Sequence, residues 1–294
     1  MNMDNVNKEL CNLWDSNNGI LKDFYITSLE NAISSCQKDK HKAENEGKNT
    51  DRYNSLIQFY TNDLNDPILA PMQFGEYPDH VDILFLGINP SFNQEMEHIR
   101  ETFTFSNFNE ENKQRMIEYD SNTVDWEKNE SNQDYFNEIL RLFKKGDGFK
   151  NLEEATKVNL DLFFIRITDQ QEIDKLIYAR NGNRYIYQTM DNQRIRVLNR
   201  FALDQTTISL GIVAKLQPKL IVVLNAGGAQ IIKDLGLIKD NEFDYKIGTY
   251  NSTLNGNLPK TPVILASQLS GGAMGVPEKE RLRWHMDWIL GKIK

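Results

Sequence analysis

The sequence has few of the residues that cross-link a fold or bind a metal. It holds two cysteines, Cys11 and Cys36, and four histidines in 294 residues. A disulfide between the two cysteines is geometrically possible, whereas two reduced thiols suit a reducing compartment. This set contains neither a four-cysteine iron–sulfur site nor the ligand spacing of a zinc finger. We therefore expect a fold that is held together by its hydrophobic core, with no metal site.

Long apolar runs and a leader-like start are also missing. No run approaches the roughly 20 apolar residues that a membrane-spanning helix needs. The first ten residues, MNMDNVNKEL, are polar and acidic, without the positively charged start and apolar stretch of a signal peptide. We therefore expect a cytoplasmic protein that does not associate with a membrane.

The chain has fewer basic residues than acidic residues. The net charge is −8 and the isoelectric point is about 5.2. Nucleic-acid-binding proteins usually have a basic footprint, so this balance argues against simple nucleic-acid binding. A local basic stripe can still lie on an acidic protein. The arginine-rich stretches Arg180–Arg200 and Lys279–Arg283 are either such a DNA-facing stripe or ordinary solvated surfaces.

The residues that are present predict two units. With 39% hydrophobic residues and 15 Phe, 11 Tyr and 4 Trp, the chain can bury one large core, with or without a smaller helical appendage. Up to residue 65, apolar residues recur at spacings of three and four, which predicts a helical extension. From Asp66 onward the pattern changes to short apolar runs, which predicts an α/β domain over residues 66–294.

Four short apolar runs in this second unit are typical of buried parallel strands. They are Val81–Leu86, Val158–Thr168, Leu220–Leu224 and Val263–Ala266. Helical patterns lie between and after them, at Gln133–Lys145, Gln205–Leu216, Gly227–Leu235 and Pro277–Leu290. This alternation predicts a three-layer α/β/α fold around a mostly parallel four-stranded sheet. The segment Asp169–Asn199 is predicted to be a partly helical insertion, and Phe243–Leu258 to be a hairpin or loop excursion.

Two of the loops that follow strands have an unusual composition. Ligands of parallel α/β sheets bind outside the carboxyl ends of the strands. Gly87–Ser91 (GINPS) combines a glycine that permits a turn, a rigid proline and the Asn89 amide, which can both donate and accept hydrogen bonds. Ser267–Ala273 (SQLSGGA) is polar and glycine-rich, so a ligand backbone can approach it closely. Purely structural interpretations also stay open. GINPS also suits a tight strand–helix turn. Asn225–Gly228 suits either a phosphate nest or close helix packing.

These two loops carry a family resemblance. GINPS after an apolar strand resembles the first motif of the uracil-DNA glycosylase superfamily, especially the mismatch-specific thymine/uracil branch, whose motif begins with GINP. QLSGGA stands where that superfamily has its second motif, a His- or Asn-led loop before the C-terminal helix. The resemblance covers residues 66–294 and leaves out the helical extension. It implies a uracil-DNA glycosylase-like fold, DNA as the partner and no cofactor, and the lack of four cysteines excludes the iron–sulfur branches.

The resemblance also implies roles for individual residues. Asn89 would orient the attacking water within the loop that Gly87, Ile88 and Pro90 complete. Ser91, where some members have a bulky aromatic that excludes thymine, implies a permissive pocket. The remaining implied roles concern the flipped base and its strand: Phe103 or Phe105 stacks on the base, Gln268 lies near a base carbonyl, Leu269 is a wedge, and Ser270 and Gly271 contact phosphates. Phe103, Phe105 and Leu269 are equally well explained as packing residues.

This chain departs from the family pattern in two places. The second motif lacks its usual proline, and Gln268 is one methylene longer than the family's Asn. On the middle strand, Asn159 or Asp161 takes the place of an Asn that faces the base, and an ionised Asp161 would repel a uracilate leaving group. The leading hypothesis is a hydrolase that cleaves the N-glycosidic bond of a flipped uracil or related damaged or mismatched base, in DNA repair by base excision. The alternatives are a repurposed member that binds nucleic acid, a nucleotide or a protein partner, the last through the N-terminal helices, and a hydrolase of free nucleosides.

Overall fold

A computed structural model describes most of the chain outside the first 25 residues. The described residues are 26–65, 78, 80–88, 124–126, 128–131, 133–146, 148–163, 170–182, 184–190, 192–252, 261–269 and 273–293. Two helices come first, one whose described part covers residues 26–45 and α2 over Asp51–Asn65. Leu29, Ala32 and Tyr60 from these helices are fully buried and belong to the same hydrophobic cluster as the sheet residues Leu84 and Leu86. The predicted helical extension therefore shares a core with the rest of the molecule.

At the centre of the molecule is a sheet that has more strands than the sequence predicts. The strands β1 (Ile83–Gly87), β4 (Lys157–Asp161), β9 (Leu220–Leu224) and β12 (Thr261–Ala266) lie in the order β4-β1-β9-β12, all parallel. Beyond β12, β11 (Thr249–Ser252) and β10 (Phe243–Asp244) add antiparallel strands. The four predicted strands are therefore the parallel part of a six-stranded mixed sheet, and the predicted Phe243–Leu258 excursion supplies the other two.

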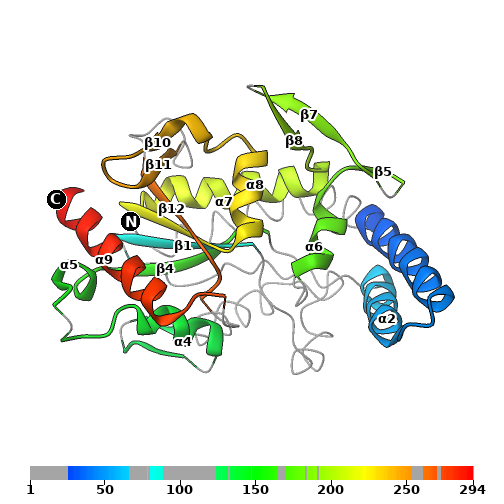
Figure 1. The fold of residues 1–294 in the computed structure, drawn as a ribbon, viewed down its shortest axis with the longest axis horizontal. Helices are drawn as coiled ribbons and strands as arrows, with labels where there is room; N and C mark the ends of the chain where they lie inside the picture. Colours follow the sequence, from blue (N-terminus) through cyan, green and yellow to red (C-terminus); the bar gives the residue numbers. More distant parts are fainter. Residues whose placement is uncertain are drawn as a thin grey trace, which may run out of the picture.

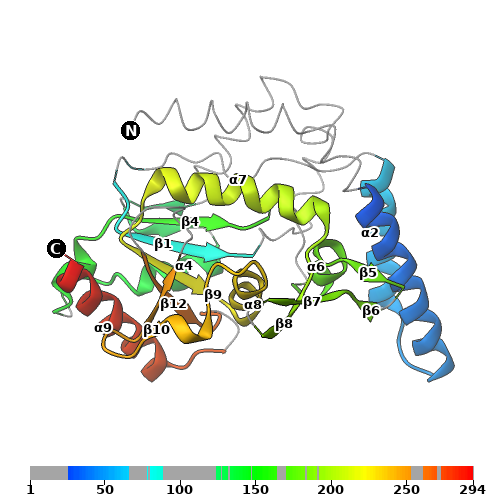
Figure 2. The ribbon, with the colours of Figure 1, turned by 90° about the horizontal axis from the view of Figure 1, so that it is seen from above.

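Helices flank both faces of this sheet, because the side chains of its strands alternate between two apolar clusters. Ile83 and Phe85 of β1 pack in one cluster with α4 (Asp134–Arg141), α5 (Lys150–Glu153) and α9 (Val276–Ile293). Leu84 and Leu86 pack in the other with α6 (Gln170–Ile177), α7 (Arg200–Leu216) and α8 (Ala226–Asp234). Figures 1 and 2 show the sheet between these two sets of helices. Burial on both faces explains why β1 and β9 are uninterrupted apolar runs.

Helix α7 shows how local sequence sets the length of an element. At its start, the Asn199 side chain accepts a hydrogen bond of 2.9 Å from the Ala202 N–H, which caps the helix. At its end, Gln217 adopts the left-handed conformation with φ 46°, directly before Pro218. The predicted stop at Gln217-Pro218 is thus confirmed, although the helix begins five residues earlier than the predicted Gln205.

The predicted insertion Asp169–Asn199 is partly helical, as expected, and otherwise forms two short hairpins. After α6, β5 (Arg180–Asn181) pairs with β6 (Arg184–Tyr185), and β7 (Tyr187–Met190) pairs with β8 (Gln193–Arg196). We call residues 178–198 the wing. The small ladder of β2 (Val124–Asp125) with β3 (Glu130–Ser131) and the 3-10 turn η3 (Asp240–Glu242) complete the described elements. None of the helices in the described ranges is both long and apolar enough to cross a membrane.

Candidate functional site

The strand order reverses at the carboxyl edge of the sheet. From β1 the chain passes to β4 on one side, and it then returns past β1 to β9 on the other. The helices after β1 pack on one face of the sheet, whereas α8, which follows β9, packs on the opposite face. Such a reversal separates the two loops and is where ligands of open α/β sheets bind. On the two sides of this reversal, the segments that follow the strands begin at Gly87 and at Asn225.

On the β1 side, Asp161 lies directly against Gly87. The two residues are partners in the parallel ladder of β1 and β4. A Cβ on Gly87 would overlap Asp161 Oδ1, and the Tyr135 hydroxyl would lie 3.7 Å from that Cβ. Gly87 is therefore required for space at this point, because any side chain would displace the carboxylate. The result is a carboxylate, a phenol and a bare backbone held together at the rim of the sheet.

Tyr135 is the residue at this rim that the sequence did not single out. It lies in the first turn of α4, and its only sequence signal is an aromatic side chain on the apolar face of a predicted helix. Burial raises the pKa of the Tyr135 phenol far above its ordinary value, and the nearby Asp161 carboxylate raises it further. Tyr135 therefore stays a neutral hydroxyl, able to donate a hydrogen bond at any physiological pH.

The edge strand β4 presents two polar side chains on the same face, as a strand must at alternate positions. Asn159 pairs with Phe85 and Asp161 with Gly87, so Asp161 is the one at the carboxyl rim. The Asn159 Oδ1 atom is buried and has no hydrogen-bond partner among the described residues. Of the two candidates for the base-facing position, Asp161 thus lies at the carboxyl rim and Asn159 lies two residues further back along the strand.

On the β9 side, Gly227 and Gly228 allow other residues to pack closely against the start of α8. The Asn225 side chain is buried and accepts a hydrogen bond of 2.5 Å from the Gly228 N–H, which caps α8. Ile88 Cδ1 lies 2.8 Å from the place where a Cβ on Gly227 would be. Ile88, only 3% exposed, therefore packs over the first turn of α8. Of the two interpretations of Asn225–Gly228, the contacts match close helix packing.

Just after β12, Gln268 and Leu269 of the predicted second motif differ in burial. Gln268 is half-buried, two residues beyond the end of the strand. Leu269 is 1% exposed and packs in the cluster with Met286 and Ile289 of α9. A wedge has to project from the surface in order to enter a duplex, so these contacts favour the packing interpretation of Leu269, and its wedge role stays a prediction.

The rim of the sheet is three strand spacings wide from β4 to β12. These are the outer parallel strands, so the backbones of Asp161 and Ala266 stand about 14 Å apart. The rim offers a carboxylate acceptor, a neutral phenol donor and an amide that does both. Among the described residues, no three His, Cys, Asp or Glu side chains gather into a metal site. Several predicted site residues lie outside the described residues, namely Asn89, Pro90, Ser91, Phe103, Phe105, Ser270 and Gly271.

Comparison with known proteins adds no family to this picture: no protein-family model and no curated protein matches the chain.

Proposed function

We propose that the protein is a DNA glycosylase-like hydrolase that cleaves the N-glycosidic bond of a flipped uracil or a related damaged base. One observation carries the proposal. β1 and β12 run parallel and are separated only by β9, so the GINPS and QLSGGA loops leave the same edge of the sheet. Their starting points are about 10 Å apart at two strand spacings. The strand-order reversal lies between them, where ligands of open α/β sheets bind, which supports a site shared by both loops.

In the proposed reaction, Asn89 orients a water molecule toward the sugar carbon of the flipped nucleotide. The water oxygen forms the new C–O bond, the N-glycosidic bond breaks, and its electron pair leaves with the base. A neutral amide is a poor general base, so the barrier falls mainly through stabilisation of the cationic sugar and the leaving group. Ser91 leaves the pocket permissive, Phe103 or Phe105 stacks on the base, and Gln268 contacts a base carbonyl.

Asp161 gives this reaction its particular chemistry. Its carboxylate lies against Gly87, two residues before Asn89. A negative charge at this place stabilises a cationic sugar and accepts a proton from water, but it opposes a base that leaves as an anion. We therefore propose that a base that departs neutral, such as an N7-alkylated guanine, is cleaved faster than uracil.

The test is a cleavage assay on oligonucleotides that carry one uracil in a single strand, opposite G or opposite A, beside one that carries N7-methylguanine. Alkali converts abasic sites into strand breaks. We expect cleavage that Asn89→Ala abolishes, and we expect Asp161→Asn to raise the rate on uracil relative to N7-methylguanine. Full activity of the Asn89→Ala protein would refute the assigned mechanism. A lower ratio for Asp161→Asn would refute the assigned effect of its charge.

A second candidate is a repurposed protein of this fold that binds a nucleic acid or nucleotide without cleaving it. The observation in its favour is the same Asp161 carboxylate at the rim, since its charge opposes the release of uracilate. Filter binding and cleavage on the same uracil oligonucleotide separate the two candidates. Binding without any cleavage at enzyme excess would support the second, and cleavage that depends on Asn89 would eliminate it.

A further inference from the structure

The wing, residues 178–198, is a basic segment of an acidic protein. It contains four arginines and one aspartate, in a chain whose net charge is −8. In both views it lies on the side of the sheet toward which β1 and β4 point, which is the side of the candidate site (Figures 1 and 2). The structure divides its four arginines into two that face inward and two that face solvent.

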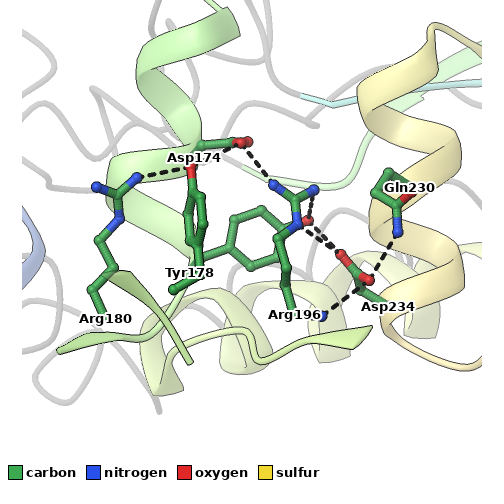
Figure 3. Close-up of polar contacts among 7 residues, drawn as sticks. Asp174, Tyr178, Arg180, Arg196, Gln230 and Asp234 are labelled. Carbon is green, nitrogen blue, oxygen red and sulfur yellow. Dashed lines mark hydrogen bonds and ion pairs between the residues drawn. The ribbon is translucent and has the colours of Figure 1, made fainter. Parts of the chain in front are cut away.

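The inward side of the wing is fixed to α8 by a buried carboxylate. The Asp234 side chain has no exposed surface and accepts hydrogen bonds from the Tyr178 hydroxyl at 2.8 Å and Gln230 Nε2 at 2.9 Å. Arg196 Nε adds an ion pair with Asp234 at 3.3 Å (Figure 3). Loss of one of these partners would leave the buried charge of Asp234 uncompensated, at a large cost in free energy. The network therefore favours one orientation of the wing relative to α8.

The two inward arginines are both used for this attachment. Arg196 also binds Asp174 at 2.8 Å, and its guanidinium lies 3.8 Å from the centre of the Tyr178 ring. Arg180 donates to the Tyr185 hydroxyl at 2.9 Å and lies over that ring. Figure 3 shows these side chains linked in one chain of contacts between α6, the wing and α8. The contacts of these two arginines are therefore made within the fold, and neither residue is exposed for binding a partner.

The other two arginines make a surface of a different kind. Arg184 and Arg194 are exposed, and neither pairs with a carboxylate among the described residues. The Arg194 guanidinium lies 3.9 Å from the centre of the Tyr187 ring. The Tyr187 side chain is itself 42% exposed, as is Ile186. The wing thus exposes two arginine charges and part of one aromatic ring to solvent.

The second arginine-rich stretch of the sequence uses two of its charges within the fold. Lys279 is paired with Glu138 of α4. Arg283 is 4% exposed and donates from Nε to the Leu142 carbonyl at 2.9 Å. These two side chains hold α9 against α4, and Arg281 is exposed. The wing differs in that the guanidinium of Arg194 lies over an exposed ring, that of Tyr187.

We propose that the wing binds a single nucleic-acid strand, with Arg184 and Arg194 on phosphates and Tyr187 stacked on a base. Arginine neutralises phosphates, and an aromatic face stacks on any base that is not already stacked in a duplex, which favours a single strand. Arg194 extends this platform, because a guanidinium over a ring stacks with the base as well. The inference does not require base excision, so strand binding can be tested separately from the proposed cleavage.

The experiment measures fluorescence anisotropy of an undamaged, labelled single-stranded 20-mer with the full chain at several salt concentrations. We expect Arg184→Ala with Arg194→Ala to weaken binding about tenfold and to reduce the slope of log K against log salt by about 1.4, at about 0.7 per phosphate. Tyr187→Ala should weaken binding about fivefold or more, whereas Tyr187→Phe should bind like the wild type, because it keeps the ring.

The matched control removes two exposed arginines from the opposite face of the sheet, Arg141→Ala with Arg281→Ala. It changes the net charge equally but leaves the wing intact, so we expect nearly wild-type binding. Equal weakening by control and wing variants, or no binding by the wild type at low salt, would overturn the proposal. Displacement of the oligonucleotide by polyglutamate at equal charge concentration would also overturn it, in favour of an acidic protein partner. Binding of this strand, together with no cleavage of the uracil oligonucleotides, would support the inference and refute only the proposed activity.

Discussion

The two ends of the central sheet use an aspartate in opposite ways. At the amino end, the Asp82 carboxylate accepts hydrogen bonds from the Thr156 N–H and hydroxyl at 2.9 and 3.0 Å. Its other oxygen pairs with Lys219 at 3.0 Å and His80 at 2.9 Å. Thr156 precedes β4 and Lys219 precedes β9, so Asp82 joins the starts of three neighbouring strands. This carboxylate is saturated by the protein itself.

At the carboxyl end, Asp161 lies over a glycine and close to a phenol that cannot ionise under ordinary conditions. The strand order reverses beside Asp161, whereas Asp82 ties the starts of three strands together. The same residue type thus stabilises the fold at one end and lies at the rim of the candidate site at the other. Substitutions at the amino end should therefore change stability, and those at the carboxyl end should change activity or binding.

The largest effect is expected from Leu269→Ala. This residue lies at the carboxyl end of the sheet, but we expect it to affect stability. Leu269 is buried in the α9 cluster. We expect the free energy of unfolding to fall by about 2–4 kcal/mol, from lost burial and the cavity left behind. Urea denaturation measures this change, with Trp284→Ala on the exposed side of α9 as the control. An unchanged midpoint together with weakened DNA binding would favour the wedge interpretation.

Gly87→Ala should have the next largest effect, and mainly at the site. The added Cβ would overlap Asp161 Oδ1, so the carboxylate has to move, at a cost of about 1–3 kcal/mol. The second change Asp161→Ala removes the overlapping atoms, so the two changes should be non-additive by about 1 kcal/mol or more. Thermal unfolding of the two single variants and the double variant measures this coupling. Strict additivity would mean that the close contact does not exist in solution.

Asp82→Asn should act on stability alone. An amide loses the ion pair with Lys219 and one of the accepted hydrogen bonds, which costs about 1–2 kcal/mol after solvent screening of these partly exposed groups. Neither strand binding nor any cleavage should change, because the site is at the other end of β1. Urea denaturation and anisotropy on the same samples give both readings. A loss of binding with unchanged stability would contradict the assignment of the two ends.

The contribution of Asp82 should also depend on pH. Partial burial opposes the charged form, but hydrogen bonds from the Thr156 N–H, Lys219, His80 and the Thr156 hydroxyl outweigh it and lower the pKa of Asp82 to about 2. A lowered pKa means that the stabilisation is complete above the unfolded value, near 3.9, and is lost as the pH falls toward 2. The advantage of the wild type over Asp82→Asn should therefore shrink between pH 4 and pH 2. A constant difference in unfolding midpoint across this window would contradict the lowered pKa.

The parallel strands were predictable because burial on both faces leaves an uninterrupted apolar run. Leu220–Leu224 was predicted with the bounds that β9 has, and the stop of α7 followed from Gln217-Pro218. β10 and β11 were not predicted as sheet strands, since they are short, partly exposed and mixed in polarity. Their pairing comes from the tertiary position beside β12, which no local pattern encodes.

The sequence pointed to two loops of the candidate site but not to the side chains that lie near them. The two glycine-bearing loops stood out by composition, whereas Tyr135 resembles any aromatic residue on an amphipathic helix. The contact of Asp161 with Gly87 depends on the register of β1 with β4, and the sequence leaves this register open. For the same reason the sequence could not divide the four wing arginines into inward and outward pairs, which depends on the distant carboxylate of Asp234.

The smallest effect is expected from Tyr135→Phe, which isolates the phenol at the carboxyl end. Burial and the Asp161 charge raise the pKa of Tyr135 so far that it should not ionise as the pH rises from 9 to 11. Removal of its hydroxyl keeps the ring in place and should change the unfolding free energy by less than about 1 kcal/mol. The growth of tyrosinate absorbance over this range should therefore be the same in both proteins, provided that circular dichroism shows both still folded. A smaller rise in the variant would mean that Tyr135 ionises normally, and that the carboxyl end is more open to water than its contacts indicate.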